Sequence, residues 1–209
     1  MKVSELFYSL QGEGKEAGRP TSFIRTAGCN LHCTYCDTTY AYTGGKTMTI
    51  DEILRDLDQY PTRLCCLTGG EPLLQPDAET LVSALILNGY HVSVETNGSL
   101  IIQPLIHHDD LIISMDIKCP SSGMTDRMKL ENLDMLRATD QLKFIITDKH
   151  DYDFAKDLLL RHHPACEVFF QPVWGTDPTK LAGWILADGL PVRLGIQLHK
   201  ILWGNRRGT

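Results

Sequence analysis

TSFIRTAGCNLHCTYCD, residues 21–37, runs from an apolar, β-branched segment directly into three closely spaced cysteines. Cys29, Cys33 and Cys36 form a CxxxCxxC pattern. Three thiolates can hold three corners of a cubane iron–sulfur cluster, whose usual complement is four protein ligands. One iron is then open, and an open coordination position allows a metal centre to react rather than only support a fold. The stretch therefore predicts a strand followed by a loop that carries a catalytic iron–sulfur cluster.

Other uses of the three cysteines fit the sequence less well. Their spacing, i, i+4 and i+7, could be a buried stripe on a helix, but the residues around them favour a loop. A structural zinc site needs a fourth ligand at a defined spacing, usually from a second CxxC pair. Cys65 and Cys66 are adjacent, whereas Cys119 and Cys166 stand alone. The odd total of seven cysteines, and opening residues without a secretory signal, argue against disulfides.

Length and composition limit the class of protein. We expect residues 1–209 to form one domain, because this length is typical of a single domain with a sizeable core. The formal net charge of −6 provides no basic footprint for a nucleic acid. No apolar stretch approaches the roughly 20 residues needed to cross a bilayer. Free cysteines and the lack of a targeting segment favour the reducing cytoplasm, so we expect a cytoplasmic protein without nucleic-acid or membrane partners.

Short apolar segments alternate with amphipathic ones along the chain. Strands are predicted at residues 2–9, 21–26, 63–68, 91–95, 111–116, 141–147, 166–171 and 192–197. Several later strands are apolar on both faces, as is typical of buried parallel sheets. Helices are predicted from a capping box at Thr49, from Pro76 to Gly89, over residues 127–138 and 151–162, and from the Asp177-Pro178 cap through Leu186.

Repeated strand–helix units predict a parallel sheet with right-handed crossovers. From residue 21 onward there are six such strands, and a seventh near the end. These are too few, in too short a chain, for a complete eight-stranded barrel of about 250 residues. The sequence therefore predicts an α/β fold: an abbreviated, partly open (β/α) barrel of about six parallel strands, with an extra N-terminal strand over residues 2–9.

Polar residues follow most of the predicted strands, at the edge where barrel-type sheets perform chemistry. They are Thr68 with the turn Gly69-Gly70-Glu71, Glu95 with Asn97, Asp116 with Lys118, then Gln171, Gln197 and His199. Each is ordinary by itself, since glycine pairs are frequent in turns and Asp116 with Lys118 could be a solvated pair. The glycine turn would also let a ligand approach the backbone closely, and Glu71 could cap that turn or accept from a ligand cation. Together these residues predict one functional rim.

These motifs resemble the radical S-adenosylmethionine (radical SAM) superfamily. Its CxxxCxΦC signature, with an aromatic residue at Φ, is matched by Cys29, Cys33, Tyr35 and Cys36, and its GGE motif by residues 69–71. The resemblance implies that the cysteines bind a [4Fe–4S] cluster and that the methionine part of SAM chelates the fourth iron. An electron then cleaves SAM to a 5′-deoxyadenosyl radical, which takes a hydrogen from the substrate while the protein positions and shields the reactants.

The resemblance also implies which residues contact SAM. Tyr35 would lie near the adenine, although it could simply be a loop aromatic. The other residues expected to contact SAM belong to the predicted rim: Gly69, Gly70, Glu71, Glu95, Asn97, Asp116, Lys118 and Gln171.

Within the superfamily, the chain is similar to the 7-carboxy-7-deazaguanine synthase family of the queuosine pathway. The matching stretches are ELFYSLQGEG at 5–14, FIR at 23–25, CDT at 36–38, DIKCP at 116–120 and QLHK at 197–200. The family has an abbreviated barrel. The resemblance implies a lyase that converts 6-carboxy-5,6,7,8-tetrahydropterin to 7-carboxy-7-deazaguanine. The radical takes hydrogen from C6, the ring contracts, ammonia leaves and SAM is regenerated.

The same resemblance implies a substrate site and a metal ligand. Residues expected to surround the pterin are Leu10, Gln11, Gly12, Glu13, Arg25, Thr68 and His199, of which His199 could equally be structural. Arginine offers a planar fork to a carboxylate, and the glutamate can accept from the amino-pyrimidine edge. The family needs Mg²⁺, and Thr38 matches its metal ligand. Charge alone would favour Asp37, because Mg²⁺ prefers carboxylate oxygens, so Asp37 is expected to support the site indirectly.

Two other functions share part of this pattern. A glycyl-radical activating enzyme would use the same cluster and SAM motifs, with a partner protein as its substrate. A non-catalytic iron–sulfur electron carrier would favour full cysteine ligation and would have little use for a GGE turn. The family resemblance further implies a flavodoxin or ferredoxin as the reductant, and a homodimer. The polar C-terminal residues 203–209 are expected either to be disordered or to cover the site.

Overall fold

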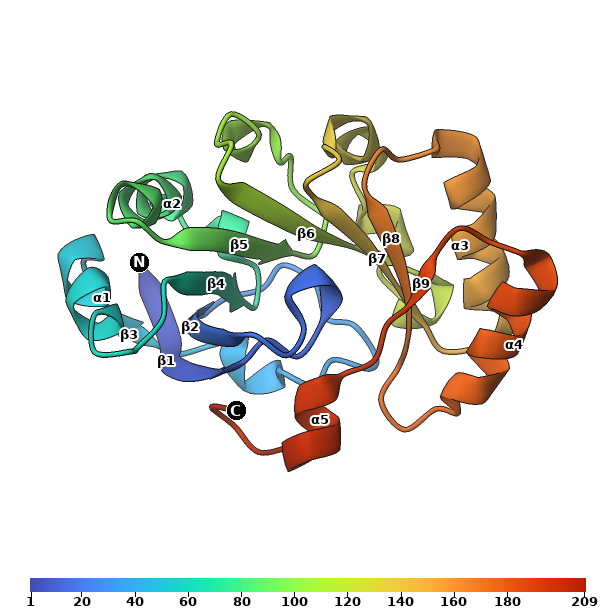
Figure 1. Cartoon of the computed structure of the whole chain (residues 1–209), viewed down its shortest axis with the longest axis horizontal. Coiled ribbons are helices and arrows are strands. Elements are labelled where there is room, and N and C mark those ends of the chain that lie inside the picture. The colour runs from blue at the N-terminus through green and yellow to red at the C-terminus, as the bar shows by residue number, and fades with distance from the viewer.

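The computed structural model describes residues 1–209 and shows one curved nine-stranded sheet (Figure 1). The strand order is β3-β1-β2-β4-β5-β6-β7-β8-β9. The strands are β1 (Lys2–Leu10), β2 (Pro20–Thr26), β3 (Lys46–Thr47), β4 (Leu64–Gly69), β5 (His91–Thr96), β6 (Leu111–Lys118), β7 (Gln141–Ile146), β8 (Glu167–Pro172) and β9 (Arg193–Leu194). β2 and β4 to β9 run parallel, and β1 is antiparallel to both β2 and β3. Because the edge strands β3 and β9 do not pair with each other, the barrel stays open, as predicted.

Five α-helices accompany the sheet, with α1 and α2 beside its first half and α3 and α4 beside its second half (Figure 1). They are α1 (Ile50–Leu57), α2 (Ala78–Leu87), α3 (Lys149–His162), α4 (Pro178–Asp188) and α5 (Leu198–Trp203). The two predicted N-terminal caps, at Thr49 and Asp177, are confirmed. Thr49 and Glu52 form the reciprocal capping box of α1, and Asp177 accepts from the backbone N–H of Thr179 at the start of α4. None of these helices is both long and apolar enough to span a bilayer.

The sheet presents different chemistry on its two faces because side chains alternate along each strand. On the helix face, residues such as Val94, Ile113 and Phe144 are buried in one core with Leu81 and Tyr152 of the helices.

The opposite face carries Arg25, Thr68, Glu95, Asp116 and Lys143, which line a cavity. The expectation that the later strands are apolar on both faces is therefore confirmed for β8, where Phe169 and Phe170 are both buried, and wrong for β6 and β7. In an open sheet only one face is covered by helices, and the other remains available for polar side chains.

The predicted helix over residues 127–138 is also wrong. The chain instead forms 3₁₀ turns at Thr125–Arg127 and Leu130–Met135. Asn132 is fully buried there, and its amide accepts from Ile102 N at 3.2 Å and donates to Leu100 O at 2.8 Å. A side chain that bonds to the backbone of a distant loop holds the segment in short turns, so a regular helix does not form.

The two ends of the sheet differ in detail from the prediction. The strand predicted at 192–197 is only two residues long, because the chain leaves the sheet at Gly195. A side chain at Gly195 would lie only 3.0 Å from Gln171 Oε1, so the backbone passes close to β8 at that point. The short edge strand β3 and the helix α5 were not predicted, since both are too short to give a periodic pattern.

A buried ion pair fixes the end of the sheet away from the cavity. Asp140 has no exposed surface, and its carboxylate accepts from Ile113 N at 2.9 Å and from Arg137 Nε at 3.0 Å. The same guanidinium donates to the carbonyl oxygens of Ile106, His108 and Leu111. The pair therefore joins the start of β6 to the loop before β7.

We expect Asp140→Ala to lower the free energy of unfolding by about 2–4 kcal/mol, because it leaves the strand N–H of Ile113 without its acceptor and the partly buried Arg137 guanidinium without its counter-charge. Denaturant unfolding of the purified protein measures this change. The matched control is Asp157→Ala, which removes an exposed i, i+4 partner of Arg161 on α3 and should change stability little. Equal losses in the two variants would contradict the role of Asp140.

Candidate active site

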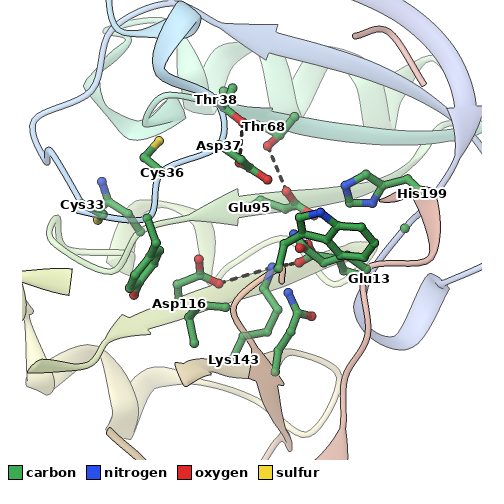
Figure 2. Close-up of a pocket in the computed structure, with 18 of the residues that line it drawn as sticks. Glu13, Cys33, Cys36, Asp37, Thr38, Thr68, Glu95, Asp116, Lys143 and His199 are labelled. Carbon is green, nitrogen blue, oxygen red and sulfur yellow. Dashed lines mark hydrogen bonds and ion pairs between the residues drawn. The ribbon is translucent and has the colours of Figure 1, made fainter. Parts of the chain in front are cut away.

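The polar face of the sheet and the loops at the carboxyl ends of its strands enclose a cavity of about 550 Å³ (Figure 2). Every residue predicted to contact cluster, SAM, substrate or metal lies on its wall except Glu71. Those on the wall are Leu10, Gln11, Gly12, Glu13, Arg25, Cys29, Cys33, Tyr35, Cys36, Thr38, Thr68, Gly69, Gly70, Glu95, Asn97, Asp116, Lys118, Gln171 and His199. Residues up to about 190 positions apart in the sequence therefore line one cavity, which we call the chamber. They meet because the carboxyl ends of the parallel strands lie at the same edge of the sheet.

The three motif cysteines lie on the loop that follows β2. Each is partly exposed, and burial raises the pKa of the Cys29 and Cys33 thiols. The Asn97 amide donates to Cys29 Sγ at 3.7 Å, a contact that would favour a thiolate at this position. Thr34 anchors the cysteine loop to the segment after β6 by donating its hydroxyl to Ser121 O at 2.7 Å.

These cysteines fit an open cluster better than zinc. Tetrahedral zinc, with bonds of about 2.3 Å, holds its sulfurs about 3.8 Å apart. The three sulfurs are not within 4.8 Å of one another as a group, and only Glu79, His107 and His108 meet that limit, away from the cavity wall. The other four cysteines are buried outside the cavity. The chain therefore offers three thiolates to the chamber, and a fourth ligand must come from a bound molecule.

The turn after β4 is packed against the backbone of the cysteine loop. A side chain at Gly70 would place its Cβ 2.1 Å from Gly28 O, so only glycine fits at this position. The next backbone N–H, of Glu71, donates to the same oxygen at 2.8 Å. The turn thus fixes the cysteine loop relative to the sheet.

Glu71 itself points away from the chamber and is fully buried. Burial raises its pKa to about 7, against the opposing effect of bonds from Asn97 N and Leu73 N. Thr96 also donates its hydroxyl, at 2.9 Å. The structure therefore places Glu71 as a brace between the loops after β4 and β5, and not on the surface that a ligand would touch.

Three buried polar atoms of wall residues make no hydrogen bond in the protein, and one of them, Asp116 Oδ1, still has the Lys143 ammonium 3.3 Å away. The Tyr35 hydroxyl and Gln171 Oε1 are buried without a hydrogen bond, and both residues line the cavity. Buried polar atoms without partners are costly, so a bound molecule that pairs with them would be stabilised. Both were predicted to contact SAM. An adenosyl group, which carries ring nitrogens and ribose hydroxyls, is a chemically suitable partner.

Arg25 presents its charged end to the chamber. Its Nε donates to Glu5 Oε1 at 2.8 Å, and this oxygen also accepts from the Tyr40 hydroxyl. Although burial opposes the charge, Tyr40 and Glu5 keep the pKa of Arg25 above its ordinary value. The terminal nitrogens make no hydrogen bond to the protein. A fork anchored at Nε and open at its tip is suited to a ligand carboxylate.

The Glu95 carboxylate also lies near this arginine. Glu95 accepts from the Thr68 hydroxyl at 2.9 Å and from the Gln11 amide at 3.4 Å (Figure 2). The Gln11 oxygen turns back to the N–H groups of Gly12 and Glu13, which fixes the loop after β1. This side of the chamber therefore combines one cation with several oriented hydrogen-bonding groups.

The predicted metal ligand lies at another part of the wall. Thr38 donates its hydroxyl to Asp37 Oδ1 at 2.9 Å, and Asp37 Oδ2 lies 2.6 Å from Lys200 Nζ (Figure 2). Burial opposes ionisation of Asp37, but the bond from Lys200 keeps its pKa below the ordinary value. Lys200 already neutralises Asp37. The lone pairs of the Thr38 hydroxyl oxygen therefore remain available to bind a metal ion. A hard cation would need oxygens from substrate or water to complete its shell.

The C-terminal segment closes one side of the chamber. His199 packs against Gly12 so closely that a Cβ there would lie 1.9 Å from its Nδ1. Burial lowers the pKa of His199. Asn205 and Thr209 also line the cavity, and Arg207 stacks over the Tyr40 ring at 3.7 Å. Of the two predicted alternatives for residues 203–209, the structure therefore supports covering of the site.

Sequence reasoning missed several wall residues, above all Lys143, Trp174 and Lys200. Lys143 lies in the middle of β7, where it is a single lysine among apolar residues. That isolated charge was the one sequence signal for a residue on the cavity wall. It marks the cavity face once the alternation of the strand is considered. Trp174 and Lys200 lie beyond β8 and β9, where no periodic pattern was available.

An open parallel barrel with three cysteines and a glycine turn at the carboxyl ends of its strands defines the radical SAM class of enzymes. The model of the Radical SAM superfamily matches residues 23–144. The fold is also that of the crystal structure of QueE from Escherichia coli, with a TM-score of 0.77, 23% identity, and coverage of 95% of this chain and 94% of that chain. Members of this class use a [4Fe–4S] cluster and SAM, and the three cavity cysteines supply the ligands that the cluster needs.

Curated relatives define the family more closely. The chain is 40% identical to a 7-carboxy-7-deazaguanine synthase of Thermoplasma acidophilum over 209 residues, which is the full length of both. It is 43% identical to one of Methanospirillum hungatei, covering 97% of this chain and 85% of that protein. The chain belongs to the 7-carboxy-7-deazaguanine synthase family.

We expect Gly70→Ala to cost about 1–3 kcal/mol of stability and to lower the iron bound per chain, because the new methyl group must displace the Gly28 backbone. Iron analysis after anaerobic reconstitution and thermal unfolding measure both effects. Gly183→Ala is the control. It meets no atom within 4 Å on α4 and should stabilise the protein by about 0.5–1 kcal/mol. Full iron loading in Gly70→Ala would contradict the packing argument.

Proposed function

We propose that this protein is a 7-carboxy-7-deazaguanine synthase, a lyase that converts 6-carboxy-5,6,7,8-tetrahydropterin to 7-carboxy-7-deazaguanine with loss of ammonia. The observation that carries the proposal is the open fork of Arg25 in the same chamber as the three cysteines. A substrate carboxylate held there would lie inside the cavity that also contains the cluster ligands. The family of the chain supports the same substrate.

The proposed SAM and substrate sites divide the chamber. To SAM we assign Tyr35, Gly69, Gly70, Glu95, Asn97, Asp116, Lys118 and Gln171, of which Glu95 contacts Thr68 and Gln11 of the substrate set. Leu10, Gln11, Gly12, Glu13, Arg25, Thr68 and His199 surround the pterin. When bound, the cluster and SAM supply the radical that starts the reaction. The side chains bind and orient the two molecules and exclude water.

For Mg²⁺ we propose Thr38 as the protein ligand, with Asp37 held beside it by Lys200. A neutral hydroxyl binds a hard cation weakly by itself. The ion would therefore bind mainly together with substrate, whose carboxylate and ring oxygens can complete the shell. In this arrangement the metal orients the reacting ring and does not support the fold.

The two rival functions are less well supported. An electron carrier would favour four cysteine ligands, but only three cysteines reach the chamber. A glycyl-radical activating enzyme would act on a polypeptide. Arg25 and the carboxylates nearby form a compact set of polar groups within about 550 Å³, a volume suited to small molecules.

We further propose that the whole chain acts as one radical SAM domain, since a single sheet contains all the site elements. A flavodoxin or ferredoxin would supply the electron, and the family resemblance favours a homodimer in the cytoplasm.

The purified, anaerobically reconstituted protein is expected to make 7-carboxy-7-deazaguanine when given dithionite, SAM and the carboxypterin, as measured by chromatography and mass. Removal of Mg²⁺ should lower turnover, and its return should restore it. A requirement for a second protein as substrate would favour the activating enzyme. If SAM does not change the spectrum of the reduced cluster and no 5′-deoxyadenosine forms, the result would favour a non-catalytic electron carrier.

Arg25→Lys keeps the charge beside Glu5 but removes the planar fork. We expect kcat/KM for the pterin to fall by about one to two orders of magnitude, because hydrogen bonds to charged groups contribute about 1.5–3 kcal/mol. SAM binding, followed by spectral titration, should change much less. Arg63→Ala, which removes an exposed ion pair with Asp58, serves as the control. Equal loss of pterin turnover and SAM binding would refute the role of Arg25.

A further inference from the structure

Lys143 links the two halves of the chamber. Its side chain is only 5% exposed, and its ammonium lies 2.8 Å from Glu13 Oε2 and 3.3 Å from Asp116 Oδ1 (Figure 2). Glu13 comes from the loop after β1, whereas Asp116 is the direct neighbour of Lys143 in the sheet register. One buried cation therefore joins the proposed pterin side to the proposed SAM side.

The two carboxylates depend on Lys143 to different degrees. Asp116 has a second cation, since Lys118 Nζ donates to its other oxygen at 2.7 Å. Glu13 has no second cation within 4.0 Å, and its other oxygen accepts from the neutral Gln197 amide at 2.9 Å. The charge of Glu13 is therefore balanced chiefly by Lys143.

Asp116 is also near Glu13, but as a second carboxylate it opposes the charge of Glu13. The remaining neighbour that could balance this charge is His199. Burial lowers the pKa of this imidazole, so it is mainly neutral near pH 7. Burial also opposes the ionisation of Glu13, but Lys143 outweighs this effect and lowers the pKa of Glu13 to about 2. Lys143 is thus the main group that keeps this carboxylate charged inside the protein, and the hydrogen bond from Gln197 acts in the same direction.

Loss of the cation would change what Glu13 can bind. A buried carboxylate without a counter-charge takes up a proton or leaves its position. A protonated carboxyl presents an O–H donor at one oxygen and can accept only at the other. The amino-pyrimidine edge of a pterin presents adjacent N–H donors, and a carboxyl can accept from two of them side by side only in its ionised form.

We propose that Lys143 is a positioning residue for pterin recognition, which holds the Glu13 carboxylate ionised and in place as the acceptor for the amino-pyrimidine edge. The inference rests on the proposed function, and it assigns to Lys143 a role that acts through Glu13. Because Asp116 retains Lys118, recognition of SAM depends on Lys143 much less.

The first test is Lys143→Met in the cluster-loaded enzyme. KM for the carboxypterin is expected to rise about tenfold or more, as for the loss of one partner of a buried charge pair, with a smaller change in kcat. The dissociation constant for SAM, from spectral titration, should change by less than about threefold, because Asp116 remains paired. An unchanged KM, or equal weakening of SAM and pterin, would overturn the inference.

A double-variant cycle with Glu13→Gln tests whether Lys143 acts through Glu13. Glu13→Gln alone should raise KM, and adding Lys143→Met should raise it little further, since the residue it serves is already altered. If the double variant raises KM by the product of the two single-variant factors, the residues act independently and the inference is wrong. This pair also decides the matter if Lys143→Met alone fails to load iron, because the double variant restores the charge balance of the chamber.

Lys156→Met is the matched control. Lys156 pairs with Asp188 at 2.8 Å outside the cavity, so its loss should leave KM for the pterin unchanged. The wild type separates the two proposals. If it makes no product from the carboxypterin, the proposed function fails whatever Lys143 does. If it turns over normally and Lys143→Met keeps the wild-type KM, only the role of Lys143 fails.

Discussion

Side chains alternate between the two faces of each strand, and this constraint divides the molecule into a core and a chamber. The helices cover one face, where Val94, Ile113 and Phe144 share a single apolar core. The other face is left to polar side chains, because the open sheet does not close on itself. A core and a ligand site are thereby built on opposite faces of the same sheet, and neither interrupts the other.

Polar groups in such a chamber must be balanced against one another. Lys143 lies between Glu13 and Asp116, Lys118 lies beside Asp116, and Lys200 neutralises Asp37. Each pair removes the cost of a buried charge while leaving lone pairs or N–H groups free for a ligand. The fork of Arg25, anchored through Nε alone, follows the same rule.

The two ends of the chain complete the wall. Glu5 of β1 orients Arg25, and Arg207 of the C-terminal segment lies 3.9 Å from the same carboxylate. His199 and Lys200 arrive on α5, beside the loop of Gly12 and beside Asp37. Elements added outside the parallel strands therefore shape the half of the chamber that we assign to the substrate.

The longer strands, four of the five α-helices, the open barrel, the cysteine loop and the glycine turn could all be predicted from the sequence. These features depend on short stretches of sequence: periodic apolar residues, a capping box at Thr49, and three cysteines within eight residues. The predicted site residues, except Glu71, all lie on the chamber wall, because polar residues after parallel strands must meet at one edge. Three features could be seen only in the folded chain: Glu71 braces two loops, residues 127–138 form turns, and Lys143 pairs with Glu13. That pair spans 130 residues, and its contact depends on the register of distant strands and on the path of loops, which no local pattern encodes.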